Sequence, residues 1–357
     1  MTRSMGYTQS EGLTALRQWV VELQRRVHNP PAMGDPTHPA NKDIIITSGS
    51  ADALCKVLES VLSPGDNVLI ENPTFPGPFK VLRPLDCNMI PVNADADGMN
   101  PENLRRALSR WSPEDAKNPT SDIPKLLYCV PTCGNPTGSC LTLTRKQEIY
   151  KLAQEYDLMI LEDDPYYYLQ FTEPLVPSFL SLDVDGRVMR LDSFSKVIAP
   201  GLRLGFLTGP CPMVQKILYK VMQSTSHPSG ISQIFVTSVL KQWGHDGFIA
   251  RSSELRRLYE DKCQQCLVYL DKHLTGLAEW TKPTGGMFIW IKILGIKDSS
   301  DVVAKVYQKG VVFITGSVFH IDSSAPSPFI RLSYILATCK EINKALSILA
   351  ECLKEEV

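Results

Sequence analysis

Short apolar runs alternate with amphipathic segments over the first 208 residues, and this alternation limits the possible folds more than any other feature. Runs that predict strands lie at 44–46, 68–71, 89–92, 125–130, 158–162, 188–191 and 204–208. Segments that predict helices lie at 12–27, 51–62, 101–111 and 144–156. Strands that alternate with helices are typical of a mainly parallel sheet with helices on both faces. The sequence therefore predicts an α/β fold for this part.

The pattern changes beyond residue 212. Helices are expected over most of 212–274, followed by two strands within 280–292, a helix at 301–309, strands at 311–314 and 329–334, and a helix at 340–353. These elements predict a smaller α+β domain at the C-terminus. We expect a large domain over residues 1–262 and a small domain over residues 263–357.

Composition excludes several classes of protein. The 357 residues are 43% hydrophobic and 21% charged, which is typical of a soluble globular protein. A net charge of -1 provides no basic field for nucleic acid, and no apolar run is long enough to span a membrane. The ten cysteines are scattered, as in an intracellular protein with reduced thiols. Cys263 and Cys266 form a CxxC in a predicted helix without a second pair, so we expect no metal site.

The stretch at 192–203, DSFSKVIAPGLR, carries the strongest chemical signal. Lys196 is the side-chain type that forms Schiff bases with carbonyl compounds. Ser193 and Ser195 add hydroxyl donors, and Arg203 adds a planar fork that suits phosphate. Together they predict pyridoxal phosphate bound covalently at Lys196. A surface lysine in a serine-rich turn is the alternative, because so short a motif recurs by chance.

Other candidates follow predicted strands, where open α/β sheets place their ligands. Ser50 begins a helix, whose N-terminus can bind phosphate, although an ordinary N-cap is the alternative. Asn135 stands in a rigid turn and offers a donor and an acceptor. Asp163 either keeps a pyridine nitrogen protonated or caps a helix. Phe75 either stacks on a ring or belongs to the core.

Arg331 interrupts an apolar strand of the small domain, FIRLSY. A charged side chain at such a position is rarely buried without a partner. We interpret Arg331 as a bidentate clamp for a substrate carboxylate. An ion pair with a carboxylate of the protein is the alternative.

These motifs together resemble those of the class I aminotransferases of pyridoxal-phosphate fold type I, over nearly the whole chain. The resemblance rests on GNPTG at 134–138, DDPY at 163–166, SFSK at 193–196, GLRLGF at 201–206 and FIRLS at 329–333. Within that family, stretches such as WSPEDAKNP, EDDPYYYLQF and DVDGRV are most similar to the kynurenine/α-aminoadipate aminotransferases of animals.

The resemblance implies roles for residues around the cofactor ring. Lys196 corresponds to the Schiff-base lysine, which is also the base of the proton shift. Asp163 corresponds to the partner of the pyridinium nitrogen. Asn135 and Tyr166 correspond to contacts of the ring hydroxyl oxygen, and Phe75 to the stacking residue, where the family usually has tyrosine.

The resemblance also implies the residues that bind phosphate and substrate. The phosphate would be held by Ser50, Ser193, Ser195 and Arg203, next to Ala51, where the family usually has glutamine. Arg331 would bind the substrate α-carboxylate, and Asn135 would also contact the substrate. Tyr7 would reach the phosphate of the partner subunit and contribute to the substrate site, so a homodimer is implied. The family has a further N-terminal segment with substrate contacts, so a fragment, an isoform and a shortened protein remain open.

The activity implied is ping-pong transamination, with L-2-aminoadipate and/or L-kynurenine as amino donor and 2-oxoglutarate as acceptor. Such an enzyme would act in lysine degradation and tryptophan metabolism in the mitochondrial matrix. The N-terminus shows no transit peptide, so the cytoplasm is the alternative location. A carbon–sulfur lyase on the same scaffold and a low-activity or inactive dimerisation partner are alternative functions. A transcription regulator is disfavoured, because this chain leaves no room for a DNA-binding domain.

Overall fold

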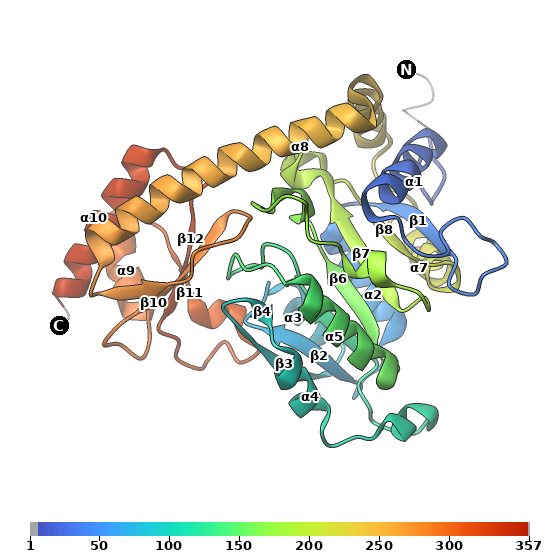
Figure 1. Cartoon of the computed structure of the whole chain (residues 1–357), viewed down its shortest axis with the longest axis horizontal. Coiled ribbons are helices and arrows are strands. Elements are labelled where there is room, and N and C mark those ends of the chain that lie inside the picture. Colours follow the sequence, from blue (N-terminus) through green and yellow to red (C-terminus); the bar gives the residue numbers. More distant parts are fainter. Residues whose placement is uncertain (1–5, 356–357) are drawn as a thin grey trace.

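The computed structural model describes residues 6–355, which form two sheets and the helices around them (Figure 1). The larger sheet has the strand order β1-β8-β7-β6-β5-β2-β3-β4. Its strands are β1 (Lys42–Thr47), β2 (Asn67–Asn72), β3 (Asn88–Asp95), β4 (Gly98–Met99), β5 (Leu126–Cys129), β6 (Met159–Asp163), β7 (Val188–Ser193) and β8 (Gly205–Pro210).

Most neighbours in this sheet are parallel. Strands β3, β2, β5, β6 and β7 run in one direction, which confirms the predicted mainly parallel sheet. Strand β8 is antiparallel to both β7 and β1, and β4 is antiparallel to β3. Because antiparallel neighbours need no long crossover, the chain passes from β7 to β8 through residues 194–204 alone.

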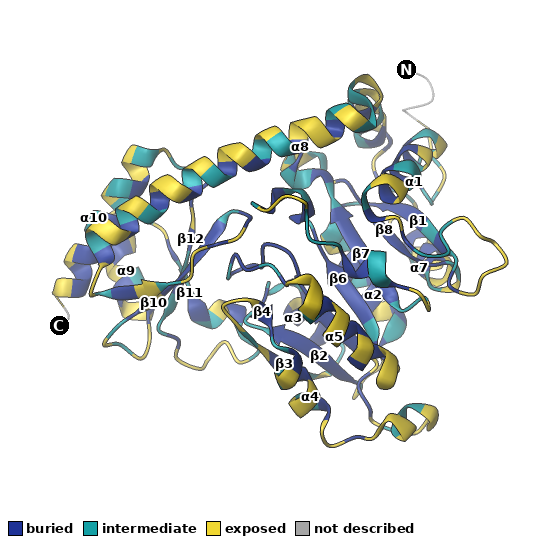
Figure 2. Ribbon diagram, viewed as in Figure 1, coloured by how far each residue is buried: buried dark blue, intermediate teal, exposed yellow. Residues whose placement is uncertain are grey.

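Helices cover both faces of the larger sheet (Figures 1 and 2). They are α1 (Thr14–His28), α2 (Ser50–Val61), α3 (Gly77–Leu82), α4 (Pro101–Leu108), α5 (Leu143–Glu155), α6 (Phe179–Leu182) and α7 (Cys211–Ser224). Val68 and Ile70 share a core with α2, α3 and α7, whereas Leu69 between them shares another with α4, α5 and α6. Burial on both faces explains why the strands are continuous apolar runs rather than alternating ones.

The second sheet is antiparallel, with the order β11-β12-β10-β9, and confirms the smaller α+β part. The strands of this sheet are β9 (Ala278–Trp280), β10 (Phe288–Ile293), β11 (Ile314–Thr315) and β12 (Phe329–Ser333). The helices of this part are α9 (Ser300–Gln308) and α10 (Cys339–Lys354). The strand predicted at 311–314 is reduced to β11. Val311 N–H bonds to the Val306 carbonyl at 3.2 Å, so this segment first closes the end of α9.

Helix α8 (Gly230–Leu274) passes along both parts of the molecule (Figure 1). It packs against α1 near its start and against α10 near its end, and it bends at Gly244, where φ is 63°. The predicted domain boundary between residues 262 and 263 falls inside this helix. That boundary stays a prediction.

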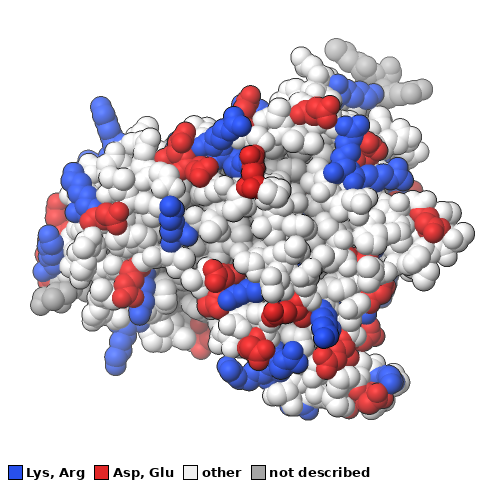
Figure 3. Space-filling model, viewed as in Figure 1, with Lys and Arg blue, Asp and Glu red and all other residues white. Residues whose placement is uncertain are grey.

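On the face shown in Figure 3, Lys and Arg lie among Asp and Glu, in keeping with the net charge of -1. Of the helices within residues 6–355, none is both long and apolar enough to cross a membrane.

Candidate active site

The junction between β1 and α2 leaves backbone amides open to the surface of the site. The N-cap of α2 is Gly49, with φ 92°, and no side chain within residues 6–355 caps this helix start. The alternative that Ser50 is an ordinary N-cap is therefore wrong. A Cβ atom at Gly49 would lie 2.9 Å from Nη2 of Arg203, so glycine lets the guanidinium approach the helix start. Open amides, the helix dipole and an arginine together favour an anion.

The short connection between β7 and β8 brings the lysine to the same corner. Ser193 ends β7, and its Oγ accepts the Ser195 N–H at 3.1 Å. This bond starts the single helical turn that holds Lys196. Arg203 has φ 49°, donates from Nη1 to the Pro200 carbonyl at 3.3 Å and is an exposed residue.

Lys196 lies over the ring of Tyr166, with Nζ 5.7 Å from the ring centroid. Burial lowers the pKa of Lys196, and the positive charges of Arg331 and Arg203 lower it further. A lysine that holds its proton weakly can act as a nucleophile and as a base.

Asp163 is buried at the end of β6 and has one satisfied oxygen and one unsatisfied oxygen. Oδ2 accepts the Tyr128 hydroxyl at 2.9 Å, while Oδ1 has no hydrogen-bond partner in the part of the chain that the structure describes. Burial raises the pKa of Asp163 to about 7, against the effect of the Tyr128 hydrogen bond. A buried carboxylate with a free oxygen suits a cationic N–H donor. Such a donor would satisfy the free oxygen with a hydrogen bond and would neutralise the buried negative charge. The helix-cap alternative is wrong, since Asp163 ends a strand.

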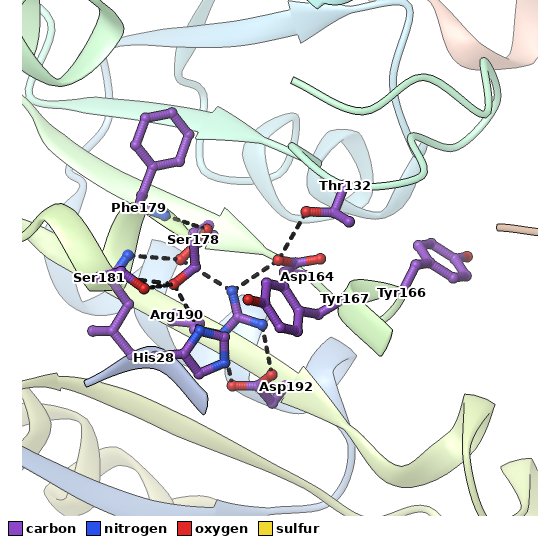
Figure 4. Close-up of polar contacts among 12 residues, drawn as sticks. His28, Thr132, Asp164, Tyr166, Tyr167, Ser178, Phe179, Ser181, Arg190 and Asp192 are labelled. Atoms are coloured by element: carbon purple, nitrogen blue, oxygen red, sulfur yellow. Dashed lines mark hydrogen bonds and ion pairs between the residues drawn. The ribbon is translucent and has the colours of Figure 1, made fainter. Parts of the chain in front are cut away.

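A buried ionic cluster surrounds Arg190 and includes Asp164, the residue after Asp163 (Figure 4). The guanidinium of Arg190 contacts Asp192 at 2.9 Å, Asp164 at 2.8 Å and Glu162 at 3.2 Å. The centroid of the Tyr167 ring lies 4.9 Å from Cζ of the Arg190 guanidinium. Because these carboxylates come from β6, β7 and the turn after β6, the cluster fixes the strand ends from which Asp163 and Ser193 project.

Asn135 and Arg331 meet from opposite parts of the molecule, although 196 residues separate them. Nη1 of Arg331 donates to Oδ1 of Asn135 at 2.8 Å. The guanidinium lies against the rings of Phe288 and Phe319, at 4.2 and 5.0 Å from their centroids. Arg331 Nε has no hydrogen-bond partner among residues 6–355. The partner of Nη1 is an amide oxygen rather than a carboxylate. Arg331 thus keeps its charge available for an anion.

A cavity of about 200 Å³ joins these parts of the site. Its lining residues are Ser50, Ala51, Phe75, Val130, Asn135, Asp163, Pro165, Tyr166, Ser193, Ser195, Lys196, Pro200 and Arg203. Every predicted cofactor contact is among them except Tyr7. Tyr7 is 95% exposed and packs edge-on against His227, with 5.8 Å between ring centroids.

Two features of the site were missed by sequence reasoning. Arg190 interrupts an apolar strand, VMRLDS, in the same way as Arg331 interrupts FIRLSY, and this signal was sufficient to find the ionic cluster. Tyr128 gave no signal, because a tyrosine in an apolar run is ordinary core composition.

The residues fit pyridoxal phosphate on chemical grounds. The uncapped start of α2 and Arg203 provide an anion site, Lys196 lies in the same cavity, and Asp163 offers an unpaired buried oxygen. Comparison with known proteins agrees with this fit. The family described as aminotransferase class I and II matches residues 1–349 of the chain.

The chain belongs to the class I and II aminotransferases. This aminotransferase is 44% identical, over 358 residues, to the mitochondrial kynurenine/alpha-aminoadipate aminotransferase of Bos taurus, covering 100% of this chain and 84% of the bovine one. It is 33% identical, over 360 residues, to an aromatic amino acid aminotransferase of Dictyostelium discoideum, covering 98% and 74%.

Solved aminotransferase structures share the fold. The kynurenine aminotransferase of Pyrococcus horikoshii, in complex with PMP, matches with a TM-score of 0.88 at 28% identity, covering 100% of this chain and 84% of that one. The alpha-aminoadipate aminotransferase of Thermus thermophilus, complexed with N-(5'-phosphopyridoxyl)-L-leucine, matches with a TM-score of 0.85 at 28% identity, covering 99% and 84%. The protein is a pyridoxal-phosphate-dependent aminotransferase of fold type I.

Proposed function

We propose that this aminotransferase transfers the amino group of L-2-aminoadipate and/or L-kynurenine to 2-oxoglutarate. The observation that carries the proposal is the cavity that Lys196, Asp163 and Asn135 line together. The pKa of Lys196 is lowered, and Asn135 is hydrogen-bonded to Arg331, which does not itself line the cavity. The names of the relatives, at 44% identity for the bovine enzyme, support the choice of donors.

Different residues of the cavity would hold different parts of the cofactor. The phosphate would be held by Ser50, Ser193, Ser195 and Arg203. The pyridine nitrogen would face Asp163, the ring hydroxyl oxygen would face Asn135 and Tyr166, and the ring would stack on Phe75. Pyridoxal phosphate supplies an aldehyde that combines with amino groups and an electron-withdrawing ring that stabilises negative charge at the α-carbon.

The side chains of this protein then perform three tasks. Lys196 Nζ takes the proton from the substrate α-carbon. The lowered pKa of Lys196 favours this role, because a free lysine titrates at about 10.4. Asp163, with Oδ2 held by Tyr128, keeps a negative charge opposite the pyridine nitrogen. Arg331 binds the α-carboxylate, and because amino acids and oxo acids share that group, one contact serves both halves of the reaction.

The activity is tested with purified enzyme, pyridoxal phosphate, L-2-aminoadipate or L-kynurenine, and 2-oxoglutarate. We expect glutamate and the matching oxo acid to form in equal amounts, together with a change in the cofactor's visible absorbance. Lys196→Ala should abolish both, while Lys80→Ala, at an exposed lysine, should change neither. Ammonia release without glutamate would instead support the carbon–sulfur lyase.

A homodimer with its two sites near the interface is the assembly we propose. Large apolar side chains on α7 and the start of α8 are more than half exposed, namely Tyr219, Met222, Ile231 and Phe235. Burying such side chains against a second copy is the usual reason for their exposure. Tyr7 lies beside the start of α8, from where it would reach the partner's phosphate and substrate.

Light scattering tests this assembly. Phe235→Glu places a charge on the proposed interface and should shift the protein towards a monomer. Leu336→Glu, at a residue that is 93% exposed in the smaller part, is the matched control and should leave the mass unchanged. Equal masses for both variants would contradict this interface.

We place the enzyme in the mitochondrial matrix, in lysine degradation and tryptophan metabolism, because the animal relatives are named as mitochondrial. The cytoplasm is the alternative compartment. Immunoblotting of fractionated cells distinguishes the two locations.

A further inference from the structure

Two cysteines stand on either side of the turn that carries Asn135. Cys133 and Cys140 are seven residues apart, and backbone hydrogen bonds fold the segment between them back on itself. Gly134 N–H bonds to the Ser139 carbonyl at 2.8 Å, and Gly138 N–H bonds to the Gly134 carbonyl at 2.7 Å. The turn therefore brings the two cysteines side by side.

The two sulfur atoms are in contact. Sγ of Cys133 lies 3.7 Å from Sγ of Cys140, and the Cys133 N–H donates to Cys140 Sγ at 3.2 Å. The Cys133 thiol has a second possible acceptor, the Tyr166 carbonyl, also at 3.7 Å. The sulfur atoms must therefore approach each other by about 1.7 Å to reach their separation of about 2.0 Å in a disulfide.

The two thiols differ in reactivity. Hydrogen bonds from the Cys133 thiol and from Thr284 lower the pKa of Cys140 to about 7, although burial opposes them. Burial raises the pKa of Cys133 well above its usual range. Cys140 is also partly exposed, whereas Cys133 is buried. Because the thiolate is the nucleophilic form, Cys140 is the attacking cysteine and Cys133 the resolving one.

The CxxC pair of α8 has the opposite character. Burial raises the pKa of Cys263 to about 11 and that of Cys266 to about 12. Both side chains are buried. Their spacing resembles a redox motif, but their environment favours inert thiols.

We propose that Cys133 and Cys140 form a reversible disulfide when the enzyme meets a peroxide, and that this bond slows transamination. The Cys140 thiolate attacks one peroxide oxygen, the O–O bond breaks, and the other oxygen leaves as water after taking a proton. The Cys133 sulfur then attacks the Cys140 sulfenic acid, and the S–O bond breaks as the S–S bond forms. The second water takes the Cys133 proton. Two thiols lose two electrons in total, and a dithiol reverses the oxidation.

The disulfide would alter the position of Asn135, two residues from Cys133. Cys133 has φ 52° and packs tightly on the loop before β10, where a Cβ at Gly285 would lie 2.4 Å from its Sγ. Moving this side chain therefore disturbs a close contact between the turn and that loop. Asn135 Oδ1 is the acceptor for Arg331, so displacement of the turn weakens the predicted carboxylate site. This effect on activity rests on the proposed function, whereas formation of the disulfide does not.

Mass spectrometry tests the disulfide directly. The reduced holoenzyme is treated with hydrogen peroxide, alkylated and digested with trypsin, which releases residues 126–145 as one peptide with Cys129, Cys133 and Cys140. We expect the oxidised peptide to carry one alkyl group, on Cys129, and to lack two hydrogen atoms. Cys133→Ser should stop at a sulfenic acid on Cys140 that dimedone traps. Three alkyl groups after peroxide, or a bond that includes Cys129, would overturn the proposal.

Kinetics tests the consequence. Oxidation should lower kcat/KM for L-2-aminoadipate about tenfold, because small displacements of positioning groups have large effects on rate, and dithiothreitol should restore it. Cys140→Ser should keep its own untreated rate in peroxide, and Cys87→Ser, at a partly exposed cysteine elsewhere, should respond like the wild type. A disulfide that forms without any loss of rate would overturn the regulatory part. An enzyme with no transaminase activity would refute the proposed function, while the peptide masses would still report the bond.

Discussion

Arg190 in β7 and Arg331 in β12 both stand in apolar strands, yet their surroundings differ. Arg190 is fully buried and contacts three carboxylates, with Asp192 bound through both Nε and Nη2 at 2.9 Å. Arg331 is partly buried, contacts the amide oxygen of Asn135, and leaves Nε without a partner within residues 6–355. The guanidinium of Arg190 is surrounded by negative charge, whereas that of Arg331 forms no ion pair with any carboxylate within residues 6–355.

This difference separates a charge that is neutralised within the protein from one that we propose binds substrate. Opposite charges that neutralise each other inside the protein hold strand ends in place but have little capacity for a ligand. A cation held between aromatic rings without a counter-ion gains most when an anion arrives. Asp163 resembles Arg331 in this respect, because its buried Oδ1 has no hydrogen-bond partner within residues 6–355.

Removing Arg190 should have the largest effect. Arg190→Met leaves three buried carboxylates without their counter-ion, so we expect the free energy of unfolding to fall by about 3–5 kcal/mol. Urea denaturation of the purified protein measures the loss. Arg251→Met, at an exposed arginine paired with Glu254, should stay within about 0.5 kcal/mol. Equal stability of the two variants would mean that the buried cluster is not structural.

Replacing Arg331 should affect catalysis instead. Arg331→Lys loses the planar fork, so we expect kcat/KM for amino and oxo acids to fall roughly 100-fold, or about 3 kcal/mol. The melting temperature should change little. Steady-state kinetics with both substrate classes measures the effect, and Ser333→Ala, at an exposed position in the same strand, is the control. A loss of stability with normal kinetics would assign Arg331 a structural role.

The raised pKa of Asp163 should make the free energy of unfolding depend on pH. Its pKa in the folded, cofactor-free protein is about 7, above the ordinary value of 3.8, so the folded protein holds this proton more tightly than the unfolded chain. Stability should therefore fall as the pH rises from about 4 to about 7, by about 3 kcal/mol from pH 5 upwards.

The variant Asp163→Asn isolates this contribution. It should lose that part of the pH dependence, while Glu71, whose pKa burial also raises to about 7, contributes equally to both proteins. Denaturant titrations at several pH values measure the difference. Parallel curves for the wild type and Asp163→Asn would show that Asp163 is already ionised and paired.

Removing the hydroxyl of Tyr128 should have the smallest effect. Tyr128→Phe takes one hydrogen bond from Asp163 Oδ2, so we expect about a fivefold loss of kcat/KM, or about 1 kcal/mol. Tyr307→Phe, at an exposed tyrosine of α9, is the control. A loss as large as that of Arg331→Lys would show that Tyr128 contacts the reacting groups.

Much of this site could be predicted from the sequence because its residues follow strands. Lys196, Asp163 and Asn135 each stand just after an apolar run, and parallel strands bring such positions to one edge of a sheet. The meeting of Asn135 with Arg331 could not be predicted from spacing, since it depends on how two separate sheets pack together. The resemblance assigned both residues to the substrate site, but it did not predict the contact between them.

The fold was predicted least well where elements are short. β4 has two residues and α3 has six, too few for either period to emerge from the sequence. The run at 311–314 has strong strand propensity, yet only Ile314 and Thr315 find a partner, at Arg331 and Ile330 of β12. Propensity describes the side chains, whereas pairing requires a neighbouring strand edge.

The antiparallel β7–β8 pair has a consequence for how this chain can change in length. Residues 194–204 carry Lys196, the proposed Schiff-base lysine, and Arg203, the proposed phosphate-binding arginine, in one short connection between β7 and β8. An insertion or deletion there would shift both groups against each other and against the start of α2. The polar segment at 112–122, which joins α4 to β5 on the surface, can vary in length without moving any of them. Homologous chains should therefore keep the spacing from Ser193 to Arg203 while their lengths differ at 112–122.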